Sequence, residues 1–106
     1  MKQAEFTECA NEIIDHCKDL LLSKGDEYTL KNIDRLSHFK KSAVLNGTSP
    51  KEALAGMMTK HTISVYDMCH DKEDHSLEKW TEKIGDHINY LILLYALVKE
   101  EQNGQD

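Results

Sequence analysis

The sequence predicts a single all-α domain over residues 1–106, built as a four-helix bundle. Three observations lead to this fold class. The chain contains only 5 glycines and 1 proline, which are too few turn-forming residues for an all-β sandwich. A hydrophobic content of 40% beside 30% charged residues is typical of a globular domain. Apolar residues recur at helical spacing in four successive segments.

The first two helices are expected over residues 7–23 and from Leu30 to Leu45. Gly25 follows the first helix as its C′ residue, because glycine adopts the left-handed conformation without strain. Asn46-Gly47 ends the second helix, whose apolar stripe is weaker. The apolar face of the first helix is formed by Phe6, Ala10, Ile13, Ile14, Cys17, Leu20 and Leu21.

The last two helices have clearer boundaries. Ser49-Pro50-Lys51-Glu52 is a capping box with proline at the first helical position, and this helix should end near Cys69 or His70. The fourth helix is expected from Ser76 to Glu100, with residues 101–106 as a frayed tail.

The run from Tyr90 to Val98 is apolar on every side, which is typical of a helix that is buried all round. A small bundle has little material to surround such a helix. We therefore predict that the C-terminal helix forms a homo-oligomer interface, in a two-fold dimer or a larger assembly.

Charge and composition exclude several kinds of partner. The formal net charge of −6 disfavours bulk nucleic-acid binding, which needs a basic surface. The apolar run of the fourth helix is far shorter than the roughly 20 residues that span a bilayer, so we expect no membrane insertion. Residues 1–8 are charged and lack a signal-like apolar run. The 3 cysteines lack metal-ligand spacing, which favours reduced thiols and a cytoplasmic location.

A polar stripe runs along each of the last two helices. If these helices are antiparallel neighbours, the two stripes meet. His61 could then act as a general base or bind a phosphate, or it could be a hydrogen-bonded core residue. The alternative for both stripes is a solvated face with surface ion pairs. The stripe residues are Lys60, His61, Ser64 and Asp67 on the third helix, and Glu82, Asp86 and Asn89 on the fourth.

Two further features are candidates for ligand binding. Lys24, Tyr28 and Arg35 cluster around the first connection and could close over a base and a phosphate, although a capped helix junction would have the same residues. Gly56 and Gly85 lie inside helices, where glycine permits close helix packing or close approach of a ligand.

The segment Glu82-Lys83-Ile84-Gly85-Asp86-His87-Ile88-Asn89-Tyr90-Leu91 resembles the second metal-binding helix of MazG-like all-α nucleotide pyrophosphohydrolases. Asp86 matches the aspartate of their Glu-x-x-Asp pattern, but Lys83 stands where the glutamate would be. The third helix offers Lys60-His61-x-x-Ser64 where the family has Glu-x-x-Glu. The resemblance implies a MazG-type cleft whose Mg²⁺ cage has been lost or rebuilt, because a lysine repels the ion and attracts phosphate.

Most of the chain, from about Lys24 to Glu100, also resembles small phage-encoded proteins with a nucleotide-modification-associated domain. The resemblance implies a phage or prophage origin, residence in the host cytosol and a role with nucleotides, but no particular reaction. It is carried by Lys24-Gly25-Asp26-Glu27-Tyr28, Arg35 with Phe39, Gly56-Met57-Met58-Thr59-Lys60-His61, and Trp80 through Tyr90.

Three functions are compatible with these features. The first is a non-catalytic nucleotide-binding protein without a cofactor, which could sequester a nucleotide-derived host immune signal. The second is a nucleoside triphosphate pyrophosphohydrolase with a reduced Mg²⁺ site at Asp67, Glu82 and Asp86. The third is a module that binds a host protein through its apolar final helix. The replaced carboxylates favour the first.

Overall fold

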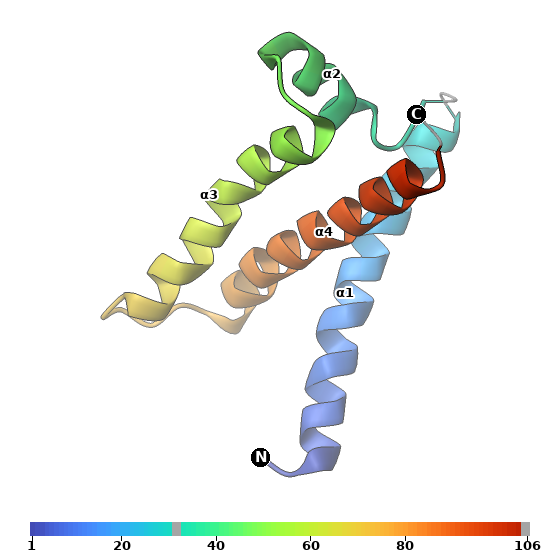
Figure 1. Cartoon of the computed structure of the whole chain (residues 1–106). Coiled ribbons are helices and arrows are strands. Elements are labelled where there is room, and N and C mark those ends of the chain that lie inside the picture. Colours follow the sequence, from blue (N-terminus) through green and yellow to red (C-terminus); the bar gives the residue numbers. More distant parts are fainter. Residues whose placement is uncertain (31–32, 105–106) are drawn as a thin grey trace.

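The structure is a computed structural model that describes residues 1–30 and 33–104, with the side chains of residues 25 and 27–30 outside the description. This part of the chain forms helices α1 (Gln3–Leu30), α2 (Ser37–Asn46), α3 (Pro50–His70) and α4 (Leu77–Gln102). It contains no strand, so the all-α prediction is confirmed (Figure 1).

Helix α1 is longer than the sequence predicted, because it continues through Gly25 to Leu30. The prediction that Gly25 ends this helix is wrong. Glycine permits the left-handed conformation but does not require it, and inside a helix it costs only about 1 kcal/mol relative to alanine. A cost of this size is small for a helix of 28 residues, so one glycine does not suffice to end it.

Helix α2 begins at Ser37, later than the predicted start at Leu30. The cause is Asp34, whose Oδ1 accepts a hydrogen bond from the backbone N–H of Leu36 at 3.0 Å. Such side-chain bonds offer the backbone an alternative to the helix. The predicted end at Asn46-Gly47 is confirmed, since Gly47 has a left-handed φ of 65° and closes the helix.

Helix α3 begins and ends where the sequence predicts. The Ser49 hydroxyl accepts a hydrogen bond from the Glu52 N–H at 3.2 Å, and the Glu52 carboxylate accepts one from the Ser49 N–H at 3.2 Å. This reciprocal pair is the predicted capping box, and Pro50 occupies the first turn. The helix ends at His70.

Helix α4 starts after Ser76, whose hydroxyl accepts a hydrogen bond from the Lys79 N–H at 3.1 Å. The helix extends to Gln102, two residues beyond the predicted end at Glu100. The Glu101 carboxylate lies 3.4 Å from the Lys51 ammonium of α3, which holds this last turn against the body of the protein. Residues 105–106 lie outside the described part of the chain.

Helix α4 is the centre of the packing, with α3 along one side, α1 along another, and α2 against α3 (Figure 1). Leu36, Phe39, Leu54 and Leu97 form the main cluster of buried side chains, and α1 contributes the buried Cys17 where it meets α4. Lys40 of α2 pairs with Asp34 and with Glu100, and so joins the start of α2 to the end of α4.

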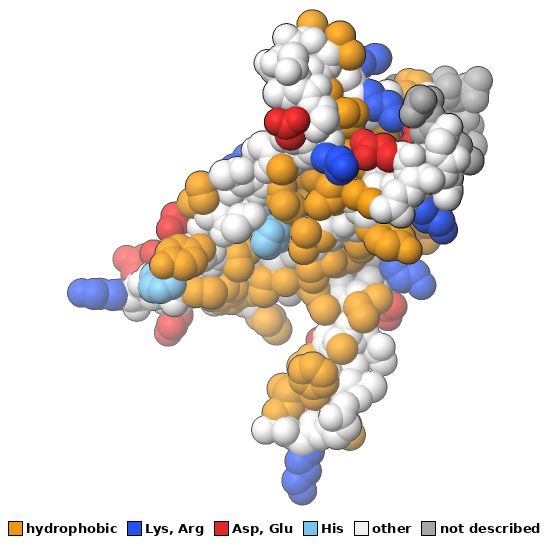
Figure 2. All heavy atoms as spheres, viewed as in Figure 1, with side chains coloured by type: hydrophobic (Ala, Val, Ile, Leu, Met, Phe, Trp, Pro, Cys, Tyr) orange, Lys and Arg blue, Asp and Glu red, His pale blue; other side chains and the backbone are white. Residues whose placement is uncertain are grey.

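The molecule is more open than its length requires. Its radius of gyration is 16.1 Å, against about 13 Å for a compact domain of this length. Among the described residues α1 packs against α4 alone, and its first half projects away from the other helices (Figure 1). The apolar half of α4 is not enclosed either, because Leu91, Ile92 and Tyr95 remain exposed. Hydrophobic side chains are visible over the body and on the projecting helix (Figure 2).

Within the described residues, no helix has an apolar stretch of the length that crossing a bilayer requires.

Candidate functional site

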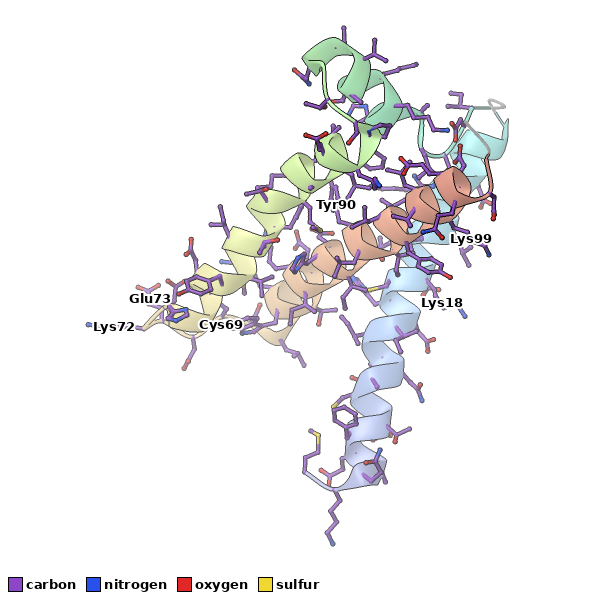
Figure 3. All side chains as sticks on the ribbon, viewed as in Figure 1. Lys18, Cys69, Lys72, Glu73, Tyr90 and Lys99 are labelled. Carbon is purple, nitrogen blue, oxygen red and sulfur yellow. The ribbon has the colours of Figure 1, made fainter. Side chains whose placement is uncertain are left out.

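A cavity of about 430 Å³ lies where the second half of α1, the turn before α2, α2 itself, α3 and α4 meet. Tyr90 lies in its wall, on the side of α4 that faces α3 (Figure 3). The size falls within the range of about 300–1,000 Å³ that is usual for small-molecule sites. The lining residues are Leu20, Leu21, Lys24, Arg35, His38, Phe39, His61, Asp86, Asn89, Tyr90 and Leu93.

The cavity brings together five of the residues that the sequence singled out. Lys24 comes from α1, Arg35 from the turn before α2, His61 from α3, and Asp86 and Asn89 from α4. The cluster around the first connection and the stripes on α3 and α4 were separate features of the sequence. In the folded chain their members share one concave surface.

The other predicted site residues do not line this cavity. Ser64 is half-buried and Asp67 is exposed further along α3, because at 1.5 Å per residue they lie one and two turns beyond His61. Lys60 and Glu82 are exposed. The Tyr28 side chain lies outside the described residues. Of the two stripes, only His61, Asp86 and Asn89 therefore reach the cavity.

Aromatic rings form one wall of the cavity. The rings of His61 and Tyr90 are 4.7 Å apart between centroids, with an interplanar angle of 32°. Phe39 meets the edge of Tyr90 at 6.4 Å, and His38 lies 6.3 Å from Phe39. Flat faces of this kind suit a planar ligand, which stacks on them or meets them edge-on.

Sequence reasoning missed most of this wall, although a signal was present. His38 and Phe39 follow Arg35 at i+3 and i+4, so the three share one face. Likewise Asn89, Tyr90 and Leu93 follow Asp86 at i+3, i+4 and i+7. The spacing of the polar residues therefore identified the face of α4, but Tyr90 and Leu93 on it were assigned to the apolar run of the predicted oligomer interface.

The polar groups of the cavity are mostly acceptors on α4 and cations at α1 and α2. The Asn89 Oδ1 is buried, and no described residue forms a hydrogen bond with it. Asp86 lies one turn earlier on the same face, within electrostatic reach of His61 and of Cys17. Lys24 is exposed and Arg35 is half-buried.

His61 is neutral near pH 7. Burial is the main cause that lowers its pKa below the ordinary value of 6.5, and Lys60, Lys83 and His87 lower it further. The Asp86 carboxylate acts in the opposite direction but does not outweigh burial. A neutral imidazole has one donor and one acceptor nitrogen, and the His61 ring lies tilted beside Tyr90 in the cavity wall.

Gly85 sets the position of α1 against α4. A Cβ atom at this position would lie 2.9 Å from Cδ2 of His16, which is closer than carbon atoms pack. Cys17 is almost fully buried beside it, with its Sγ 3.7 Å from the Gly85 carbonyl oxygen. Burial raises the pKa of the Cys17 thiol, and so does the nearby Asp86. Leu20, Leu21 and Lys24 follow within two helical turns, so this contact places the α1 wall of the cavity.

Gly56 differs from Gly85. Nothing lies within 4 Å of where its Cβ would be, so no helix approaches it.

The carboxylates of the alternative Mg²⁺ site do not gather. Among the described residues no group of three or more His, Cys, Asp or Glu side chains is placed to hold a metal ion. Of Asp67, Glu82 and Asp86, only Asp86 lines the cavity, and the other two are exposed.

A comparison with models of known protein families gave no match, and neither did comparisons with curated proteins or with solved structures.

Proposed function

We propose that this protein is a non-catalytic nucleotide-binding protein, and that the nucleotide lies in the cavity between α1, α2, α3 and α4. One observation carries the proposal. Two cationic side chains, an aromatic wall and two acceptor groups, drawn from every helix, line the same concave surface. A nucleotide presents the matching chemistry, because it joins an anionic phosphate to a planar base with hydrogen-bonding edges.

Each group has a role that follows from its chemistry. Lys24 and Arg35 bind the phosphates through charge-assisted hydrogen bonds. The Tyr90 and Phe39 rings contact the face of the base. Asp86 and Asn89 accept hydrogen bonds from the base or from ribose hydroxyls. The unpaired Asn89 Oδ1 supports this role, because a buried acceptor without a partner is costly unless something donates to it.

Isothermal titration calorimetry tests the proposal with mononucleotides, triphosphates and cyclic dinucleotides, each with and without EDTA. Cyclic ligands belong in the panel because sequestration of a nucleotide-derived host signal is one use of a non-catalytic site. We expect binding that survives EDTA and ligand that is recovered intact by chromatography. Absence of binding to every nucleotide refutes the proposal, and release of pyrophosphate would identify an enzyme instead.

A matched pair of variants assigns the binding to this cavity. Lys24→Gln removes a cation from the lining, whereas Lys72→Gln removes one from the far end of the molecule, beyond α3 (Figure 3). Both residues are exposed, so neither change should unfold the protein. Nucleotide affinity should fall about tenfold in the first and stay unchanged in the second, since a charged hydrogen bond is worth about 1.5–3 kcal/mol.

We also propose that the protein forms a homo-oligomer through the C-terminal half of α4. Leu91, Ile92 and Tyr95 are exposed there, and Tyr95 exposes 70% of its surface. Adjacent large apolar side chains of this kind mark interaction sites. Light scattering coupled to size exclusion gives the mass directly, and a monomer at all concentrations would contradict this second proposal.

A further inference from the structure

The first half of α1, residues 3–16, is an arm that the described part of the chain covers only at its end, where His16 meets Gly85. Its apolar residues follow the helical period, so they form one continuous face. Phe6 is 58% exposed and Ile14 is 52% exposed, whereas Cys17, where the arm reaches α4, is 1% exposed. The sequence predicted this apolar face, and only its end is buried.

The polar side of the arm has a clear pattern too. Glu8, Glu12, Asp15 and Asp19 lie opposite Phe6 and Ala10 on the helix at 100° per residue. An amphipathic helix of this kind is stabilised in proteins mainly by packing of its apolar face, and much less by propensity alone. The arm therefore needs a surface that this chain does not supply.

The total exposed area gives the size of the missing surface. The chain exposes 8003 Å², whereas a folded monomer of 12.2 kDa exposes about 6,100 Å². The difference, about 1,900 Å² on one chain, is larger than the roughly 800 Å² that each partner buries in a standard complex. It fits an obligate homodimer, in which each chain buries about 1,000–2,500 Å².

We propose that the arm packs its apolar face against a second copy of this chain. This inference rests on the self-association proposed above and adds the arm to the α4 surface as part of one interface. A second copy is the occupant that the area favours, because excess surface of this size is typical of chains that fold together with their own partner. Each copy would bring both apolar surfaces, the arm and the exposed half of α4.

The arm also belongs to the helix that forms one wall of the cavity. Leu20, Leu21 and Lys24 continue the same helix beyond the crossing at Gly85. Packing of the arm on a second copy therefore fixes the helix from which the proposed nucleotide site is built.

Two double variants test the proposal by light scattering and analytical ultracentrifugation. Phe6→Gln with Ile14→Gln removes the apolar face of the arm, and glutamine keeps its helix propensity. Glu8→Gln with Glu12→Gln makes the same kind of change on the polar side. We expect the first pair to weaken self-association at least a hundredfold and the second to leave it unchanged, with far-UV circular dichroism showing that the total helix content is kept.

Three outcomes separate the ideas. A wild-type protein that is monomeric at all concentrations overturns the second copy as occupant and the α4 proposal together. A wild-type oligomer that the arm variants leave intact, while Ile92→Gln with Tyr95→Gln dissociates it, overturns the arm alone. Hydrogen exchange of the wild-type protein gives an independent reading. Amides of residues 3–16 should be as protected as those of α4, and exchange at the rate of an open helix contradicts the proposal.

Discussion

The two glycines inside α3 and α4 should respond in opposite ways to the same substitution. Gly56→Ala adds a methyl group where no atom lies within 4 Å, so only the backbone effect remains. Alanine is favoured over glycine in a helix interior by about 1 kcal/mol, and the variant should be more stable by that amount. For a domain of this length the melting temperature should rise by about 4–8 °C.

Gly85→Ala gains the same helix propensity as Gly56→Ala, but it also introduces a steric clash that lowers stability by more. The new methyl group would lie 2.9 Å from Cδ2 and 3.2 Å from Nε2 of His16, so the imidazole or α1 itself must move. Overpacking of this kind costs about 1–3 kcal/mol. Subtracting the gain of about 1 kcal/mol from the helix leaves a net loss of up to about 2 kcal/mol. The His16 Nε2 is buried, so the ring has little open space into which it can swing.

A double-mutant cycle with His16→Ala tests the cause. Removing the imidazole removes the clash, so Gly85→Ala in that background should gain stability as Gly56→Ala does. The coupling free energy between positions 16 and 85 should then be about 1–3 kcal/mol. Urea unfolding followed by far-UV circular dichroism at one fixed protein concentration measures all four variants. If Gly85→Ala stabilises the wild type as much as Gly56→Ala does, the close α1–α4 crossing is not present in solution.

Three further predictions concern local features. Ser49→Ala should lower the free energy of unfolding by about 1 kcal/mol through loss of the capping box with Glu52, and Ser49→Thr should restore most of it in the same urea assay. The hydrogen bond from Lys40 lowers the pKa of Asp34 in the folded protein. The contribution of this pair to stability is therefore present above the unfolded-state pKa of about 3.9, and it is lost as pH falls through the lower folded-state pKa. The free energy of unfolding of Asp34→Asn should then be lower than that of the wild type by less than about 1 kcal/mol at neutral pH, because the pair is partly exposed. In strong acid the two free energies should be equal. Burial lowers the pKa of His61, so the wild type should lose stability as pH falls below 6.5, and His61→Gln should lose less over the same pH range.

Local signals in the sequence predicted the helix boundaries well where a side chain caps the backbone. The capping box at Ser49 and the left-handed Gly47 each depend on residues within one helical turn, and both predictions are confirmed. Gly25 shows the limit of this reasoning. It has the same conformational freedom as Gly47, but α1 continues through it, because glycine permits the left-handed conformation without requiring it. The hydrogen bond from the Leu36 N–H to the Asp34 side chain is also a local signal. An aspartate at this position could have indicated that the helix starts later.

The site could be predicted only in part, because it depends on how α1 crosses α4. Helical spacing placed Asp86 and Asn89 on one face and put His61 beside it, and these three do line the cavity. The same spacing included Ser64 and Asp67, which lie too far along α3. Lys24 and Arg35 join the cavity through the tertiary arrangement alone. The small residue that permits the crossing, Gly85, was visible in the sequence, but its partner His16 was not.

The open arm and the cavity both follow from the position of α1. Among the described residues, α4 is the only helix that packs against α1, and the close part of this contact is at Gly85. A nucleotide that contacts Lys24 and a second chain that covers Phe6 would therefore stabilise the same element from its two ends. Because binding free energies are reciprocal, a nucleotide that strengthens self-association must itself bind more tightly to the oligomer than to the monomer. The two proposals therefore make a joint prediction, which is that nucleotide affinity rises with protein concentration. The double variant Phe6→Gln, Ile14→Gln should lose this concentration dependence, although both substitutions lie outside the cavity.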